Sequence, residues 1–220
     1  YYKQLADLGY LSAINNLGIM YGYGKGVKRD LNTACLLYKR AAEAGEGSMS
    51  FRNLGICYEN GHGNFEKNIN KAIKCYEKSA DLGSEEAVYD LAVVHDGMND
   101  YKKSLPLYKQ ASQSKDNIIK AKSLYAVGDM LTNGDGVPKD YKKAVEYFNQ
   151  SAKLGYSNAY NDLGVMYEDG KGVKKDHVKA LFNYRKAAEL KNMYGLYNVA
   201  RCYDYSIEVP DRYHLVNRLK

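Results

Sequence analysis

Proline and long apolar segments are scarce in this chain, and both absences bear on its class. Only three prolines occur in 220 residues, so the composition allows long helices. No segment approaches the roughly 20 apolar residues of a membrane span, and the first residues lack the charged-then-apolar order of a signal sequence. Charged residues mix both signs without a long block of one sign, although the formal net charge is +6. We therefore expect a folded protein with no membrane partner, and its charge alone does not indicate nucleic acid.

Motifs for enzymatic chemistry are also missing. We find no nucleophile elbow, no phosphate-binding glycine loop and no pair of metal ligands at helical or loop spacing. The four histidines lie far apart in the sequence, at His62, His95, His177 and His214. We predict that the protein is not an enzyme and that it holds neither a cofactor nor a metal.

A repeat runs through the chain instead. A pair of residues, one large and aliphatic and the next small, recurs at steps of 37, 37, 36, 36 and 36 residues. The six pairs are Leu17-Gly18, Leu54-Gly55, Leu91-Ala92, Val127-Gly128, Leu163-Gly164 and Val199-Ala200. A period of this size predicts stacked helical hairpins, which form an elongated binding surface rather than a closed catalytic pocket.

The fifth unit shows how one repeat is built. A helical pattern of apolar residues ends at Gly170, and a second pattern, which includes Tyr184, begins after Asp176. Gly170 and Gly172 permit positive φ angles in the turn, and Asp176 is a suitable N-cap for the second helix. We call the first helix of each repeat helix A and the second helix B.

Small residues recur inside helix A. A glycine in a helix interior costs about 1 kcal/mol relative to alanine, so its use in four of the six pairs predicts close packing there. A second small residue stands five positions before the small member of each pair, at Ala13, Ser50, Ala87, Ser123, Ala159 and Gly195. We expect neighbouring helices to approach closely at both positions.

The linked positions of each repeat resemble the Sel1-like repeat family, relatives of the tetratricopeptide repeat. The string L-G-x-x-Y, G-x-G-V, D, then A-x-x-x-Y-x-x-A-A-x-x-G is complete from Leu17 to Gly45, and the resemblance extends from Tyr1 to about Leu219. It implies an all-α fold, a right-handed α-solenoid of about six antiparallel helix pairs, commonly used as an adaptor in protein complexes.

We read residues 1–220 as a single array. It comprises a partial helix at 1–9, repeats at about 10–46, 47–83, 84–119, 120–155 and 156–191, and a partial repeat at 192–220. Tyr2, Ala6 and Gly9 match the register of a helix B, so we expect the sequence to begin halfway through a helix. After Pro210, a second helix should begin around Leu215, and we expect the chain to be a piece of a longer protein.

The third repeat departs from the pattern. It lacks the glycine turn, and Pro106 falls where helix B should already be under way, so we expect that helix to start late or to bend. Extra residues from Gln113 to Ile119 should lengthen its exit. Drift within one repeat and a functional bend or docking loop both remain open.

The cysteines could form disulfides, since some secreted bacterial relatives pair one cysteine from each helix of a repeat. The register here differs, because Cys57 and Cys202 occupy the position of Met20, whereas Cys35 and Cys75 lie in helix B. We therefore predict buried free thiols, which favour a reducing compartment and an intracellular, cytoplasmic location.

The resemblance to tetratricopeptide repeats implies that helix A lines the concave side, so we predict the contact residues for a partner from positions fixed relative to each small residue. The predicted partner-binding residues are Asn16, Arg52, Asn53, Tyr89, Asp90, Tyr125, Asp129, Asn161, Asp162, Glu168, Tyr197 and Asn198.

Charge is distributed unevenly over these positions. We count the residues at six distances from the small residue of each pair, namely −6, −3, −2, +1, +4 and +5. Over the six repeats these positions hold nine acids and three bases, Arg52, Lys122 and Arg201, so the inferred groove has a charge of about −6 in a protein of +6. The nine acids are Glu59, Glu86, Asp90, Asp96, Asp129, Asp162, Glu168, Asp169 and Asp204. This pattern predicts a partner segment that carries Lys or Arg, although solvated helix faces can also vary in charge for no functional reason.

Three functions remain in competition. The first is a non-catalytic scaffold or adaptor that binds a protein or peptide in the acidic groove. The second is RNA binding, because helical repeats can read one base per repeat, but the basic residues lie in turns without regular stacking aromatics. The third is a secreted Sel1-like protein with a cell-wall-type ligand. The oligomeric state is not indicated.

Overall fold

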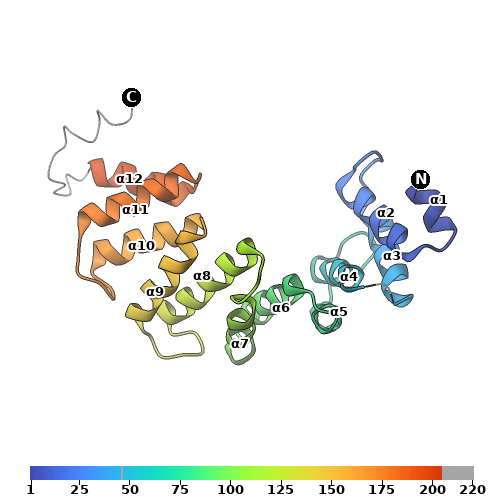
Figure 1. Cartoon of the computed structure of the whole chain (residues 1–220), viewed down its shortest axis with the longest axis horizontal. Coiled ribbons are helices and arrows are strands. Elements are labelled where there is room, and N and C mark those ends of the chain that lie inside the picture. The colour runs from blue at the N-terminus through green and yellow to red at the C-terminus, as the bar shows by residue number, and fades with distance from the viewer. Residues whose placement is uncertain (46, 205–220) are drawn as a thin grey trace. The chain divides into compact units, whose positions relative to one another are not determined.

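Helices follow one another along the whole described chain. A computed structural model describes residues 1–45 and 47–204, and within them it contains helices and no strand (Figure 1). The first helices are α1 (Tyr2–Asp7), α2 (Leu11–Tyr23), α3 (Leu31–Glu43), α4 (Ser48–Asn60), α5 (Ile69–Asp81) and α6 (Glu85–Gly97). They are followed by α7 (Tyr101–Ala111), α8 (Asn117–Asn133), α9 (Tyr141–Lys153), α10 (Ser157–Asp169), α11 (His177–Glu189) and α12 (Met193–Asp204). The predicted all-α array of helix pairs is confirmed.

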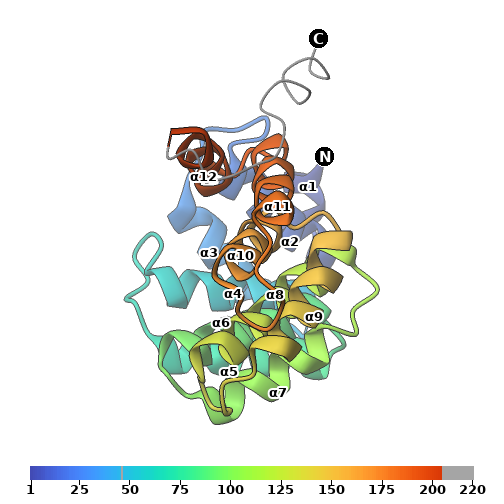
Figure 2. The ribbon, with the colours of Figure 1, turned by 90° about the vertical axis from the view of Figure 1, so that its left-hand side faces the viewer.

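The chain divides into two units, with the boundary between Leu107 and Tyr108 inside α7. In the first unit, helices A and B of the first two repeats are α2 with α3 and α4 with α5. In the second unit the pairs are α8 with α9 and α10 with α11, and α12 packs on α11; Figure 2 shows α10 beside α11. No described helix is both long enough and apolar enough to cross a membrane.

The small member of each repeat pair forms the contact between helices A and B. An aromatic ring of helix B lies directly on the glycine of helix A. A Cβ atom placed on Gly55 would lie 2.5 Å from the Tyr76 ring, and one placed on Gly128 would lie 2.7 Å from the Phe148 ring. The same arrangement joins Gly18 to Tyr38 and Gly164 to Tyr184. The predicted close packing is confirmed at these positions, because any larger side chain would displace the ring.

Helix starts and turns also follow the sequence pattern. Asp176 caps α11 by accepting a hydrogen bond from the Lys179 amide at 2.9 Å. Asp30 and Asp140 cap α3 and α9 in the same way, and Asn68 takes this role for α5. Gly170 and Gly172 have φ angles of 74° and 72°, so the turn between α10 and α11 uses backbone that disfavours a side chain.

The third repeat is built differently from its prediction. Helix α7 starts at Tyr101, after the three residues 98–100 that follow α6, so its start is not late, and Pro106 lies inside it. Part of the expected long exit is helical, because α8 already begins at Asn117, capped by Asp116. The extra residues therefore lengthen helix A of the fourth repeat to 17 residues. The residues predicted to form a helix after Pro210 lie outside the described part of the chain.

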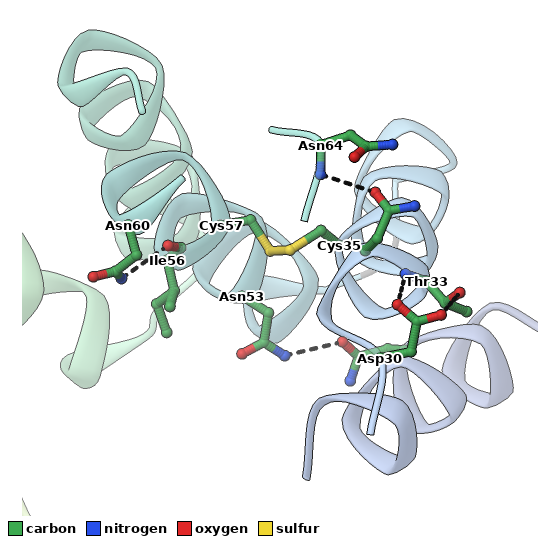
Figure 3. The surroundings of a disulfide bond; sticks show 10 residues. Asp30, Thr33, Cys35, Asn53, Ile56, Cys57, Asn60 and Asn64 are labelled. Atoms are coloured by element: carbon green, nitrogen blue, oxygen red, sulfur yellow. Dashed lines mark hydrogen bonds between the residues drawn. A yellow bond between two sulfur atoms is a disulfide. The ribbon is translucent and has the colours of Figure 1, made fainter. Parts of the chain in front are cut away.

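The cysteine prediction is wrong for one pair. Cys35 of α3 and Cys57 of α4 form a disulfide with their Cα atoms 5.9 Å apart (Figure 3). The bond joins helix B of the first repeat to helix A of the second, so a comparison restricted to pairs within one repeat could not find it. Cys75 and Cys202 are free thiols, as predicted, and burial raises the pKa of Cys75 to about 11.

Candidate interaction face

The predicted partner-binding residues lie on helices A, and we describe them by row. A row is the set of residues at one distance from the small member of the Leu-Gly pair, so row −3 lies three residues before it and row +4 lies four residues after it. We call rows −6, −3, −2, +1, +4 and +5 together the A-helix face. Each unit carries its own part of this face.

Rows −3 and −2 are joined by hydrogen bonds between consecutive repeats. In the first unit, Asn53 donates to Asn15 at 3.2 Å (Figure 3), and the Arg52 Nε donates to Asp90 at 2.6 Å. In the second unit, the Tyr125 hydroxyl donates to Asp162 at 2.9 Å, and Asn198 donates to Asn161 at 2.9 Å. A residue of row −3 thus bonds to row −2 of the next repeat in all four cases. Most of the predicted contact residues therefore hold neighbouring A helices together.

Arg52 and Asp90 form a partly shielded ion pair. Their side chains are 26% and 17% exposed, so the pair is better shielded from solvent than an ordinary surface salt bridge. Burial raises the pKa of Asp90, while the hydrogen bond and charge of Arg52 act in the opposite direction. The pair fixes α4 against α6.

A second set of bonds links helix B to row +4 of helix A. The Tyr76 hydroxyl donates to Glu59 at 2.5 Å, and the Tyr184 hydroxyl donates to Glu168 at 2.5 Å. Arg201 of the following repeat also donates to Glu168 at 2.5 Å. These carboxylates thus satisfy buried hydroxyl groups, and burial together with the hydrogen bond raises the pKa of both tyrosines.

Row +4 lacks a carboxylate in the first and fourth repeats. In the fourth repeat, where the ring belongs to Phe148, row +4 holds Thr132, whose hydroxyl donates to its own helix at Gly128. In the first repeat, row +4 holds Gly22, although helix B keeps Tyr38 with its hydroxyl. This relation between hydroxyl and carboxylate is visible in the sequence, but only once the two rows are known to meet.

These bonds change the meaning of the predicted acidic groove. In the first unit, four acids of the A-helix face accompany only Arg52, and in the second unit the described acids outnumber Lys122 and Arg201. Several of these acids are bonded to neighbouring helices or to bases, namely Glu59, Asp90, Asp162, Glu168 and Asp169. Glu86 and Asp129 accept hydrogen bonds within their own repeats, from Ser84 and Asn133. The excess of acids remains in each unit, but much of it is shared with neighbouring donors.

The exposure of the predicted contact residues varies. Tyr197 is 67% exposed and projects from α12. The others are half-buried, including Asn16, Tyr89 and Asp129. Among residues 1–45 and 47–204, no group of three or more His, Cys, Asp or Glu side chains could hold a metal ion.

Removing the hydroxyl of a tyrosine should matter only where row +4 supplies a carboxylate. We expect Tyr76→Phe to lower the free energy of unfolding by about 2 kcal/mol, because it deletes a charge-assisted bond and leaves Glu59 without that donor. Tyr38→Phe, the matched variant in the first repeat, should change it by less than about 0.5 kcal/mol. Urea unfolding of both variants measures the difference, and equal losses would show that the carboxylate is irrelevant.

Asp162 should give an unusual pH dependence. Burial raises its folded-state pKa above the unfolded value, so the folded state binds the proton more tightly. Its contribution to stability is therefore largest below the unfolded pKa and falls as the pH rises through the folded pKa. Asp162→Asn should therefore gain stability relative to wild type as the pH rises from 4 to 7. Urea unfolding at the two pH values tests this, and a pH-independent difference would contradict it.

The geometry matches known repeat proteins. The family model described as "Sel1 repeat" matches residues 11–46, 52–84, 121–156 and 157–192, which leaves the irregular third repeat unmatched. A crystal structure of a Sel1 repeat protein from Oxalobacter formigenes is 31% identical, covers 89% of this chain and 79% of that one, and superposes with a TM-score of 0.78. A protective antigen of uropathogenic Escherichia coli with an SLR fold is 32% identical, with a TM-score of 0.75 over 94% of this chain and 44% of that chain.

A curated relative matches a shorter stretch. The DAP3-binding cell death enhancer 1 of Rattus norvegicus is 40% identical over 85 residues, which are 39% of this chain. The matched stretch is 16% of the length of that relative. This similarity therefore concerns a few repeats within a much longer protein.

Proposed function

Because the chain belongs to the Sel1 repeat family, we propose that it is a non-catalytic scaffold whose A-helix face holds a segment of a partner protein. The repeat fold of this family is in general that of protein-interaction scaffolds. The observation that carries the proposal is the set of bonds between rows −3 and −2. These bonds hold side chains of consecutive A helices in place before any partner arrives, which reduces the ordering cost of binding.

The charge of the face supports a partner segment that carries Lys or Arg. In each unit the acids of the A-helix face outnumber the bases, although the whole chain has a net charge of +6. Complementary charge speeds association and disfavours partners of the same sign. Tyr197 adds exposed aromatic area with a polar end, a common feature of protein interfaces. Nucleic acid is disfavoured on this face, because phosphates would meet an excess of carboxylates.

The test compares acids on the A-helix face with acids on helices B. Asp90 and Asp162 are poor sites for charge reversal, because both carboxylates are bonded to neighbouring repeats. We would replace Glu86 and Asp129 with Gln and Asn, and measure fluorescence polarisation with a pool of Lys- and Arg-containing peptides. We expect affinity to fall about tenfold, which corresponds to about 1.4 kcal/mol.

The matched control replaces Glu77 and Glu146, which are exposed on helices B, with glutamine. This control removes the same charge from the other side of the repeats, so it should leave the affinity within about twofold. Equal losses in both double variants would mean that only net charge matters. No loss in either would overturn the acidic face as the binding surface.

The disulfide favours one second candidate, a secreted Sel1-like protein with a cell-wall-type ligand. Disulfides persist mainly in oxidising compartments, and Cys35–Cys57 is such a bond. Co-sedimentation of the protein with insoluble peptidoglycan tests this candidate. Protein that stays in the supernatant at low salt would rule out peptidoglycan as that ligand.

A further inference from the structure

A cavity of about 290 Å³ opens on the A-helix face of the first unit, between α2 and α4. Its lining includes Tyr38 and the Cys35–Cys57 disulfide, together with Ile19 and Ile56 from row +1. Arg29, Arg52 and His62 also line it, and no Asp or Glu does. The cavity is thus a place without lining acids on a face that is otherwise rich in them.

The cavity lies at the position where the second and fifth repeats place a carboxylate. In the second and fifth repeats, row +4 holds Glu59 and Glu168, and each accepts a hydrogen bond from the tyrosine of helix B. In the first repeat, row +4 holds Gly22, and a Cβ atom placed there would lie 3.3 Å from the Tyr38 hydroxyl. Within the described residues, no carboxylate accepts a bond from Tyr38. The first repeat therefore keeps the donor and lacks the acceptor.

An arginine stands beside the same position. The Arg29 Nε donates to the Gly22 carbonyl at 3.1 Å, which holds the guanidinium next to the missing side chain. At the fifth repeat, Glu168 accepts bonds from Tyr184 and from Arg201 of the following repeat, so a tyrosine hydroxyl and an arginine share one carboxylate there. The first repeat presents the same two donor types. Burial raises the pKa of Tyr38 to about 12, so its hydroxyl keeps its proton at neutral pH.

We propose that this cavity binds a carboxylate of the partner segment, in the place that glutamate occupies in row +4 of other repeats, with Tyr38 and Arg29 as its donors. The carboxylate belongs to a Glu or Asp side chain or to a free C-terminus. The inference rests on the proposed function and sharpens it, because it assigns the partner one acidic anchor within a segment otherwise rich in Lys and Arg.

The size and chemistry of the cavity fit this occupant. Pockets for drug-sized ligands have volumes of about 300–1,000 Å³, so 290 Å³ suits one side chain or chain end. An arginine favours a carboxylate over an amide, because the guanidinium only donates and its bonds to an ionised acceptor are charge-assisted. The Tyr38 hydroxyl can donate a second bond to the same carboxylate. Ile19 and Ile56 provide apolar contact for the methylene groups of a glutamate.

The test uses blocked nonapeptide pools of constant Lys and Arg content, with either Glu or Gln at the central position. Fluorescence polarisation measures their affinity for the whole chain. We expect the Glu pool to bind wild type about tenfold more tightly than the Gln pool. A third pool has central Gln and a free C-terminus. Comparing it with the Gln pool whose C-terminus is amidated distinguishes binding of a terminal carboxylate from binding of a side chain.

Three variants locate the preference. Gly22→Glu supplies the carboxylate from the chain itself, so it should bring the ratio of Glu to Gln affinities to about one. Tyr38→Phe and Arg29→Gln should each reduce the ratio at least threefold, since each removes one donor. The matched control is Gly97→Glu, which adds the same charge on the A-helix face at a position with no atom within 4 Å, and it should keep the ratio.

The outcomes separate this inference from the proposed function. Equal binding of the Glu and Gln pools, or a ratio unchanged by Gly22→Glu, would overturn the carboxylate site while leaving the scaffold intact. If no pool binds, the proposed function fails, and NMR titration with N-acetylglutamate amide then decides the site alone. A shift of the Arg29 Nε–H signal in wild type but not in Gly22→Glu would support the site, and no shift would overturn it.

Discussion

Gly55→Val is expected to lower the free energy of unfolding of the first unit by about 3 kcal/mol, at the upper end of the cost of overpacking a core. A Cβ atom at this position already lies 2.5 Å from the Tyr76 ring, and valine adds two further methyl groups. Tyr76 is fully buried and bonded to Glu59, so the ring cannot move aside without losing that bond. Urea unfolding followed by far-ultraviolet circular dichroism measures the loss.

Gly97→Ala is the matched control, because it changes a helical glycine of α6 that has no atom within 4 Å of a new Cβ. It should leave stability unchanged or raise it by up to about 1 kcal/mol, as alanine favours the helix. A similar loss of stability in both variants would show that backbone flexibility, rather than contact with Tyr76, explains why the small residue of the Leu-Gly pair is a glycine.

The glycines show what could be predicted from the sequence. A glycine at a fixed place in a helix carries a known cost, so its recurrence predicted close packing before any partner was known. Which side chain packs on each glycine became known only from the structure, which places rings such as Tyr38 and Tyr184 of helix B against the glycines of helix A. The same holds for the N-caps, since Asp176 satisfies backbone groups within its own turn. Features that depend on a few neighbouring residues were predicted correctly.

Only part of the candidate site could be predicted from the sequence. Rows −3 and −2 were identified, but not that they bond to each other, because Arg52 and Asp90 are 38 residues apart and meet only through the approach of α4 to α6. The net charge of these rows is unaffected by such bonds, so the acidic groove stays a prediction, but the sequence did not show that acids such as Asp90 are bonded to neighbouring repeats. The cavity at Tyr38 was missed for the same reason. The sequence shows a glycine in row +4 of the first repeat, but that glycine indicates a cavity only once it is known to face the hydroxyl of Tyr38.

The α7–α8 segment shows a different limit. Pro106 removes a backbone donor, which suggested a helix that starts late or bends, and of these two alternatives the late start is wrong, because α7 begins at Tyr101. The extra residues before α8 looked like a linker, but Asp116 accepts hydrogen bonds from the amides of Ile118 and Ile119 and starts the helix there. The start of α8 is therefore set by its N-cap, Asp116, whereas the prediction placed that start by comparison with the neighbouring repeats.

Reduction of the Cys35–Cys57 disulfide is expected to lower the free energy of unfolding by about 3 kcal/mol, since the bond closes a loop with a sequence separation of 22 residues. Because it joins helix B of one repeat to helix A of the next, it should also make the first two repeats unfold together. Urea unfolding with and without dithiothreitol measures the effect. Cys35→Ala/Cys57→Ala should abolish the response to dithiothreitol, whereas Cys75→Ala/Cys202→Ala should keep it.

Thiol titration of the denatured protein tests the pairing itself. Two thiols should react before reduction, from Cys75 and Cys202, and four after it. The count also bears on the compartment, because the prediction of a cytoplasmic location relied on free cysteines and loses that support if the bond forms. Four reactive thiols in protein prepared without reductant would contradict the disulfide and restore that argument, while the glycine and tyrosine contacts that hold α3 to α2 would stand unchanged.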